Sequence, residues 1–149
     1  MFKKTLAGLT ALVIGTSCYA PQYRPDKIFI GNRFTKESAK ATLQELLRNR
    51  EERIVQIMAG PEQPCCLRDC VVNDEKISCS TICWRGSNPT RYPPENYEPT
   101  IEYHQVEEMM CHGNRAGVYL KSPLQAKEII FSDETDCQQF VDALTYLKN

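Results

Sequence analysis

The sequence predicts an α+β domain, in which a small antiparallel sheet is accompanied by an amphipathic helix near the N-terminus and a helix at the C-terminus. Two patterns favour this class. Apolar residues recur at spacings of three, four and seven in an early segment and in the last segment, which is typical of amphipathic helices. Between these segments, short runs of β-branched and aromatic residues alternate with turn residues, which is typical of antiparallel strands. A chain of 149 residues suffices for one domain with a hydrophobic core.

The first helix is expected to begin at Thr35, which can act as its N-cap, and to continue until Gly60 and Pro61 stop it. Ser38 stands where a complete capping box has glutamate or glutamine, so the box is expected to be incomplete. As an alternative, residues 53–58 can form a strand in place of the end of the helix. The apolar stripe consists of Ala39, Leu43, Leu46, Leu47, Ile54, Ile57 and Met58.

The chain carries five cysteines within nineteen residues, on either side of a natural four-residue turn, Asn73–Lys76. A hairpin built around this turn places Cys70 opposite Cys79 and Cys66 opposite Cys83. The two cysteines of each strand are four residues apart and therefore share one face. Opposed cysteines at narrow, non-hydrogen-bonded positions can form disulfides. We therefore predict a hairpin that is stapled by these two bonds.

A zinc site is the competing interpretation of these cysteines. The two cysteines of each strand are about 13 Å apart along an extended backbone, too far to converge on one ion, so no metal is expected. Apart from Cys18, which is considered below, three cysteines remain, namely Cys65, Cys111 and Cys137. A disulfide from Cys65 to Cys111 or to Cys137 is expected, without a preference between the two. One thiol then stays without a partner in the chain.

The second half of the chain begins with residues 85–100, which hold four prolines and no apolar periodicity and are expected to form a surface loop. A partly alternating segment and two strands are expected between residues 100 and 132. The last helix is expected to begin at Ser132 or Asp133, with acidic residues in its first turn. The apolar face of this helix consists of Phe140, Val141, Leu144 and Leu147.

Residues 117–147, GVYLKSPLQAKEIIFSDETDCQQFVDALTYL, resemble the closing strands and the terminal helix of pleckstrin-homology-like domains. In that family the last strand runs into a helix that plugs the end of a curved sheet, and the resemblance implies the same arrangement here. The phosphoinositide binding of the family needs a basic cluster near the first hairpin. The corresponding hairpin of this chain, residues 70–79, has an acidic tip. We therefore do not expect this chain to bind phosphoinositides.

The N-terminus has the pattern of an export signal. Lys3 and Lys4 precede an uncharged, mostly apolar run of twelve residues, which has the length of a signal-peptide core and is too short to span a bilayer. The stretch VIGTSC that ends this region resembles the lipobox of bacterial lipoproteins, although Gly15 stands where leucine is commonest. The resemblance implies a signal peptide at residues 1–17. It also implies that Cys18 becomes the first mature residue and carries diacylglycerol and an N-acyl chain.

Several acyl chains give stable membrane anchoring. Residues 18–34 contain scattered prolines and aromatic residues and are expected to be the lipid-attached tether, in which KIFI, residues 27–30, is the candidate for a short strand. The folded domain is then residues 35–149. Tyr19 follows the cysteine, without the aspartate that retains enterobacterial lipoproteins at the inner membrane. The resemblance therefore implies the outer membrane, in a cell that has one. The alternative is simple secretion as a soluble or periplasmic protein.

Composition and motifs argue against several classes of function. The net charge is −1 and there is no basic stripe, which argues against nucleic-acid binding. His104 and His112 are too far apart along a strand to share an ion. The chain has no nucleophile elbow, phosphate loop or zinc-protease motif, so no catalytic residue, metal or cofactor is predicted. Export would place the cysteines in an oxidising compartment.

The sequence therefore predicts a lipid-anchored envelope protein with a binding or structural role at the membrane surface. Its expected contacts are the membrane, through the lipid on Cys18, and an envelope protein of unknown identity. The alternative is a secreted thiol-dependent enzyme or redox factor that uses one of the unpaired cysteines.

Overall fold

Nine strands and three α-helices form the part of the chain that the computed structural model describes, namely residues 22–48, 54–58, 64–85, 88–90, 99–121 and 125–149. The predicted signal peptide and Cys18 lie outside the described residues. All strand pairs are antiparallel. This part of the chain therefore has the α+β architecture with an antiparallel sheet that the sequence predicts.

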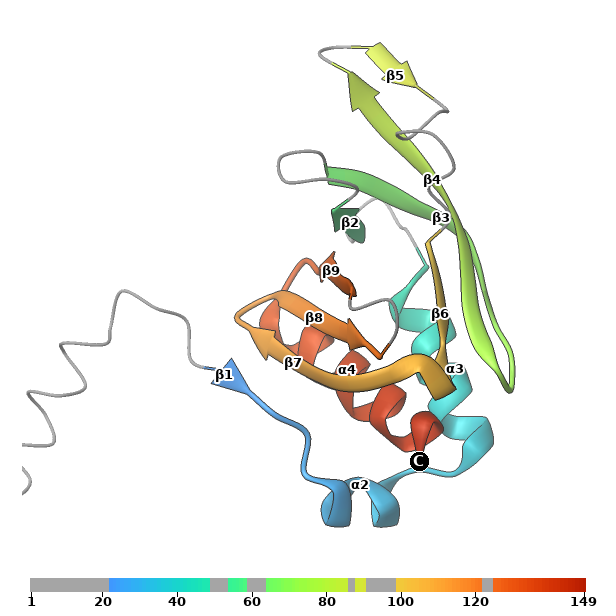
Figure 1. Ribbon diagram of the computed structural model, residues 1–149, viewed down its shortest axis with the longest axis vertical. Helices are drawn as coiled ribbons and strands as arrows, with labels where there is room; N and C mark the ends of the chain where they lie inside the picture. The colour runs from blue at the N-terminus through green and yellow to red at the C-terminus, as the bar shows by residue number, and fades with distance from the viewer. Residues whose placement is uncertain (1–21, 49–53, 59–63, 86–87, 91–98, 122–124) are drawn as a thin grey trace, which may run out of the picture.

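The sheet has the strand order β1-β7-β8-β9-β2-β3-β4-β5, and β6 pairs with the other end of β4 (Figure 1). A short 3-10 turn, η1, covers Tyr103–Gln105 between β6 and β7. The strands are β1 (Gln22–Tyr23), β2 (Gln56–Met58), β3 (Pro64–Val72), β4 (Lys76–Arg85), β5 (Asn88–Thr90), β6 (Thr100–Glu102), β7 (Val106–His112), β8 (Arg115–Leu120) and β9 (Gln125–Ile130).

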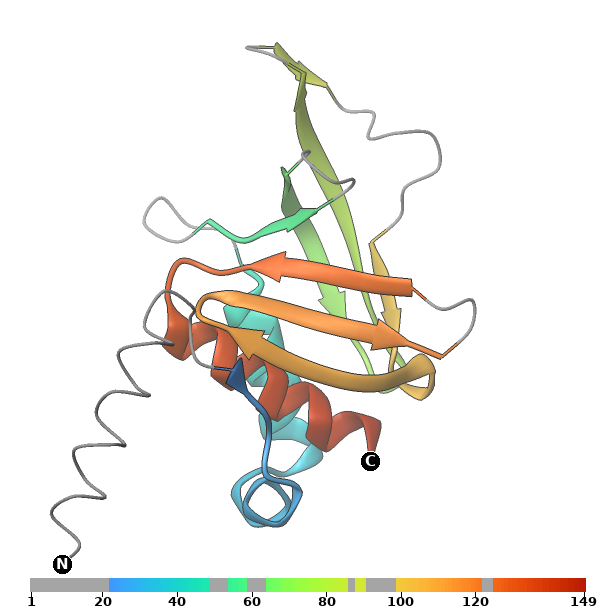
Figure 2. The ribbon, with the colours of Figure 1, turned by 60° about the vertical axis from the view of Figure 1, so that its left-hand side comes forward.

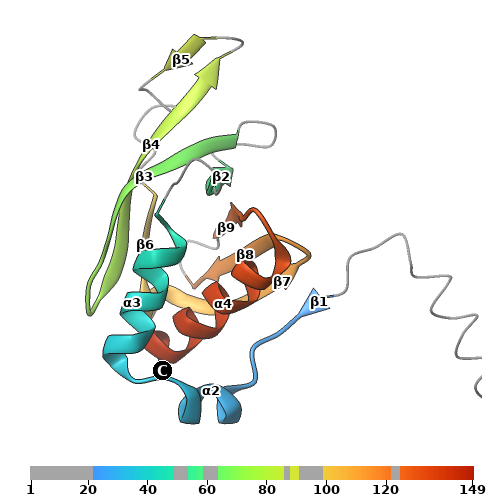
Figure 3. The same cartoon turned by 180° about the vertical axis from the view of Figure 1, so that it is seen from behind.

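Two helices pack on one face of the sheet. Helix α4 (Glu134–Lys148) lies behind β7 and β8 in Figure 2, and α3 (Lys36–Leu46) packs against both α4 and β3. Figure 3, which shows the molecule from behind, places these helices in front of the curved sheet. A third helix, α2 (Lys27–Arg33), packs against α4. The core between the helices and the sheet includes Leu43, Leu47, Leu67, Ile129, Phe131, Phe140 and Leu144.

The first predicted helix is shorter than expected. It ends at Leu46, and residues 56–58 form β2 instead, so the strand alternative is correct for this stretch. Strand β2 pairs with β9 on one side and β3 on the other, and thereby joins the two halves of the sheet. Ile57 is 1% exposed, since it faces the core from this central position. The backbone groups of β2 gain partners on both sides, which a final helical turn would not provide.

The N-terminus of α3 also differs from expectation. The Thr35 hydroxyl accepts a hydrogen bond from the Ser38 backbone N–H at 3.0 Å, and the Ser38 hydroxyl accepts one from the Thr35 N–H at 2.8 Å. The capping box is therefore complete, because a serine hydroxyl performs the role expected of glutamate.

The KIFI segment is not a strand. It belongs to α2, whose N-cap is Asp26. The Asp26 carboxylate accepts hydrogen bonds from the backbone N–H groups of Ile28 and Phe29, at 3.0 and 3.2 Å. This cap satisfies donors that a seven-residue helix would otherwise leave to water. The predicted tether, residues 18–34, is therefore folded from Gln22 onward.

The cysteine-rich hairpin forms, but its register changes part of the way along. Val72 lies opposite Ile77 next to the turn, as predicted. Farther out, Cys65 instead of Cys66 lies opposite Cys83. The predicted Cys66–Cys83 disulfide is therefore wrong, and Cys65 bonds to Cys83.

The cause is a β-bulge in β3. Asp69 and Cys70 together occupy the space that faces Cys79 alone in β4. Asp69 has a φ of 50°, a left-handed conformation that aspartate tolerates better than most residues. Since successive side chains alternate between faces, one extra residue exchanges the faces of every residue beyond it. Cys65 consequently faces the core, with no exposed surface, and Cys66 faces the other way.

Helix α3 stabilises the bulged strand through the amide of Gln44. Its Nε2 donates a hydrogen bond to the Cys70 carbonyl at 2.6 Å, and its Oε1 accepts one from the Val72 N–H at 3.1 Å. One side chain therefore satisfies two backbone groups next to the irregularity. This pairing links the position of the bulge to the packing of the helix.

The described residues contain three disulfides. In the hairpin, Cys65–Cys83 and Cys70–Cys79 have Cα–Cα separations of 4.2 and 4.1 Å, close to the narrow pair type that the sequence argument requires. The third bond joins Cys111 in β7 to Cys137 in α4. The expected link from Cys65 to one of these two is therefore wrong. Cys66 has no disulfide partner among the described residues.

The second half of the chain follows the predicted order. Strands β8 and β9 lead into α4, whose N-cap is Asp133, which accepts a hydrogen bond from the Asp136 N–H at 2.8 Å. The predicted loop at residues 85–100 includes β5, which pairs with the end of β4. Residues 91–98 of that loop lie outside the described part of the chain.

The bulge makes a prediction about substitutions at Asp69, which is exposed to solvent. Asp69→Val should lower the free energy of unfolding by about 1–3 kcal/mol, because a β-branched residue is strained at this φ. Asp69→Gly should cost nothing or stabilise slightly, because glycine adopts this conformation freely. Chemical denaturation of the oxidised protein measures both, with Arg68→Val as the control at the neighbouring exposed position. Equal stability of Asp69→Val and Arg68→Val would contradict the bulge.

Candidate functional site

The N-terminal residues of the described chain, 22–34, run from the edge of β7 to the C-terminal helix, and we call them the docked segment (Figure 1). At its start, β1 pairs with β7, so that Tyr23 lies opposite Cys111. At its end, α2 packs against α4. The docked segment leads directly from the predicted lipidation site to the folded domain, and this position makes it the candidate functional region.

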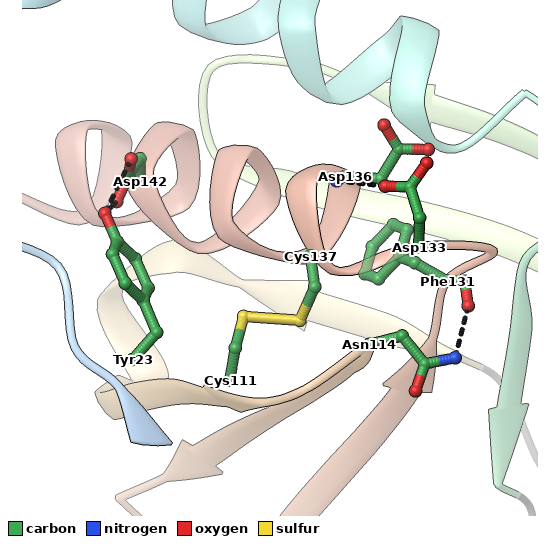
Figure 4. The surroundings of a disulfide bond; sticks show 8 residues. All are labelled: Tyr23, Cys111, Asn114, Phe131, Asp133, Asp136, Cys137 and Asp142. Carbon is green, nitrogen blue, oxygen red and sulfur yellow. Dashed lines mark hydrogen bonds between the residues drawn. A yellow bond between two sulfur atoms is a disulfide. The ribbon is translucent and has the colours of Figure 1, made fainter. Parts of the chain in front are cut away.

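A buried carboxylate, Asp142 of α4, holds both ends of the docked segment. Its side chain is almost fully buried, with 3% of the residue exposed. The Tyr23 hydroxyl donates to its two oxygens at 2.8 and 3.0 Å, as Figure 4 shows. An Arg33 guanidinium nitrogen also donates to it at 3.2 Å. A buried charge is costly unless it is paired and hydrogen-bonded, and here both donors come from the docked segment.

The third disulfide lies next to these contacts and joins β7 to α4. Cys111 is the cross-strand neighbour of Tyr23, and Cys137 precedes Asp142 by little more than one turn on α4 (Figure 4). Both cysteines are fully buried. The docked segment is therefore joined to a strand and a helix that are themselves covalently linked.

Burial affects both groups of the tyrosine–carboxylate pair. Burial, together with the hydrogen bond to Asp142 and the charge of that carboxylate, raises the pKa of Tyr23 from 10.0 to about 12. Burial also raises the pKa of Asp142, against the lowering effects of the Tyr23 hydrogen bond and the Arg33 charge. Tyr23 therefore remains a protonated donor at neutral pH.

Two grooves flank α2. One, of about 480 Å³, lies between α2, the start of α3, the β3–β4 turn and the end of α4, and is lined by Lys27, Ile30, Lys36, Asp74, Tyr146 and Leu147. The other, of about 250 Å³, lies between the docked segment, β7 and α4, and is lined by Arg24, Lys27, Glu107, Glu108, Thr145 and Lys148. Both are lined by charged side chains together with apolar ones, and Lys27 contributes to both.

Lysine side chains converge at the smaller groove. The Lys148 ammonium donates a hydrogen bond to the Glu107 carbonyl at 2.7 Å. Burial lowers the pKa of Lys148, and the charges of Lys27 and Lys121 lower it further, against a smaller opposing effect of Glu107. Arg24 at the groove forms an ion pair with Glu108. The local charge is therefore more positive than the overall composition suggests.

The other candidate residues do not gather into a site. His104 lies in η1 and His112 at the far end of β7, and both are exposed. Cys66 lies in β3 and is half-buried. Within the described ranges, no three His, Cys, Asp or Glu side chains are placed to hold a metal ion. The helices of the described ranges include none that is long and apolar enough to cross a membrane.

Comparisons with protein-family models, with curated proteins and with solved structures found no match. The resemblance of residues 117–147 to pleckstrin-homology-like domains therefore stays a prediction.

Sequence reasoning missed the docked segment and its contacts. The signal that could have identified α2 is Asp26, an N-cap residue directly before KIFI. Asp142 gave a weaker signal, since it stands next to Val141, a predicted core residue. Neither signal reveals that Tyr23 and Arg33 converge on this carboxylate, because that contact depends on how the sheet and the helix pack.

The cluster predicts an unusual tyrosine titration. The difference in tyrosinate absorbance between the wild type and Tyr23→Phe should titrate near pH 12 in the folded protein, and near pH 10 in denaturant. Because the pKa is raised on folding, the stability that this group contributes is present below pH 10 and is lost as the pH rises from 10 to 12. A difference that titrates near pH 10 in the folded protein would show that the hydroxyl is not buried against Asp142.

Proposed function

We propose that this protein is an exported envelope protein, attached to a bacterial membrane by lipid on Cys18, with a binding or structural role at the membrane surface. The observation that carries the proposal is cysteine usage. Of the seven cysteines in the described residues, six form three disulfides. Disulfides persist in oxidising compartments and are rare in the cytosol, which supports export.

The lipobox-like stretch VIGTSC supports lipid attachment at Cys18. The docked segment shortens the connection between that lipid and the domain. Between Cys18 and Gln22 there are four residue steps, which span at most about 14 Å. A tether that extended through residue 34 would span as much as about 55 Å. The proposed anchor would therefore hold the domain close to the bilayer, on a short connection.

The two grooves beside α2 support a binding role near that surface, and an envelope protein is the proposed partner. A pleckstrin-homology-like arrangement is part of the proposal for the fold, on the basis of the order β8, β9, α4. Phosphoinositide binding in the manner of that family is not part of it. The turn of the β3–β4 hairpin carries Asp74 and Glu75, which would repel phosphate groups.

Metabolic labelling with radioactive palmitate in growing bacterial cells tests the anchor. The wild type should incorporate the label, and Cys18→Ala should lose it completely. Cys66→Ala is the matched control, because it removes the other cysteine that the described residues leave without a disulfide partner, and it should keep the label. An unlabelled wild type that is found in the periplasm or the medium would favour the soluble, secreted alternative. Label retained by Cys18→Ala would place the lipid elsewhere.

A further inference from the structure

Helix α2 presents two neighbouring large apolar side chains to solvent. Ile28 is 82% exposed and Phe29 is 61% exposed, the highest values among the large hydrophobic residues of the described ranges. The next residue, Ile30, is 2% exposed and anchors the helix to the domain. Isolated apolar residues are common on protein surfaces. Two adjacent ones on a short, firmly docked helix form a protruding apolar edge.

The same region carries positive charge. Lys27 stands next to Ile28, and among the described residues neither Lys27 nor Lys121 forms an ion pair. These two ammonium groups are near enough to Lys148 to lower its pKa. Among the acidic residues nearby, Glu108 pairs with Arg24, whereas the Asp26 carboxylate caps α2 and keeps its negative charge. The Glu107 carboxylate remains as an opposing charge on the rim.

The smaller groove also contains an unsatisfied polar atom. The hydroxyl of Thr145 is buried and has no hydrogen-bond partner in the described part of the protein. It lines the groove together with Lys27 and Lys148. A buried hydroxyl without a partner is unusual, but with under 1 Å² of exposed surface it is not accessible to a lipid phosphate, so the lysines carry the argument for phosphate contact.

The position of α2 matches that of the proposed anchor. The chain is folded from Gln22 onward, so the proposed anchor at Cys18 lies at most about 14 Å from β1, the strand that precedes α2. Figures 1 and 3 both show α2 at one extremity of the molecule, beside the end of α4. A bilayer that held the lipid of Cys18 would lie close to the domain, where the outlying helix α2 could contact it.

We propose that α2 is a membrane-contacting edge, at which Ile28 and Phe29 enter the interface of the bilayer while Lys27, Lys121 and Lys148 contact the phosphates of anionic lipids. The combination of an apolar edge with lysine side chains is the chemistry that interfacial helices use. The inference rests on the proposed lipid anchor. It adds that the domain lies on the membrane in one orientation.

Fluorescence quenching by brominated lipids tests this orientation in the full chain. A tryptophan is introduced as Phe29→Trp, and the lipidated protein is reconstituted into vesicles of brominated phosphatidylcholine and phosphatidylglycerol. The control is Ile54→Trp, since Ile54 is a comparably exposed apolar residue, at 52%, and precedes β2, a strand that Figure 1 shows well separated from α2. The wild type contains one tryptophan, Trp84, whose spectrum is subtracted from both.

We expect the tryptophan at position 29 to lose most of its emission and the tryptophan at position 54 to retain it. Adding Lys27→Gln, or omitting phosphatidylglycerol, should weaken the quenching at position 29. One lysine near an anionic surface contributes a factor of about five in binding.

Flotation of the vesicles reports on the anchor separately. Protein that floats without quenching at position 29 would overturn the membrane-contacting edge and leave the anchor intact. Equal quenching at both positions would also overturn it, because the domain would then have no preferred orientation. Quenching that requires native envelope proteins would make the edge a protein-docking surface and contradict the proposal. Protein that does not float would overturn the anchor and this inference with it.

Discussion

The bulge at Asp69 is the constraint on which the cysteine chemistry of this domain depends. One extra residue in β3 determines that Cys65, and not its neighbour Cys66, faces the core opposite Cys83. With the bulge, both hairpin disulfides lie on the side of the sheet that the helices cover. Gln44 of α3 satisfies the Cys70 carbonyl and the Val72 N–H next to the bulge, so the irregular strand and the helix support each other. On the chain-entropy model each hairpin bond contributes about 2–3 kcal/mol.

The docked segment is the second organising feature, and it connects the fold to the proposed function. A flexible tether would separate a lipid anchor from the domain, whereas here the chain is fixed by strand pairing, by a buried carboxylate and by a helix within a few residues of Cys18. The Cys111–Cys137 disulfide lies directly beneath these contacts. A pull on the N-terminus would therefore act on both the sheet and the C-terminal helix.

Local patterns in the sequence predict several elements well. The turn at Asn73–Lys76, the Cys70–Cys79 pair and the terminal helix all follow from residues that are close together in the chain. The failures depend on tertiary context. The spacing of Ile57 and Met58 fits a helix as well as a strand. They form a strand because β9 and β3 pair with this segment on its two sides. The sequence does not reveal the bulge, since a single exposed aspartate within β3 does not by itself indicate an extra residue. The contact between Tyr23 and Asp142 joins residues that are far apart in the sequence, so no pattern could reveal it.

The most direct test of this account is the assignment of the thiol state of the two adjacent cysteines in β3. The oxidised protein is denatured and alkylated with one reagent, then reduced and alkylated with a second, and fragment ions assign each label to residue 65 or 66. The account predicts that Cys66 carries the first label and Cys65 the second, with Cys65 recovered in a bond to Cys83 before reduction. The opposite labelling, with Cys66 bonded to Cys83, would show a hairpin without the bulge and would contradict the account.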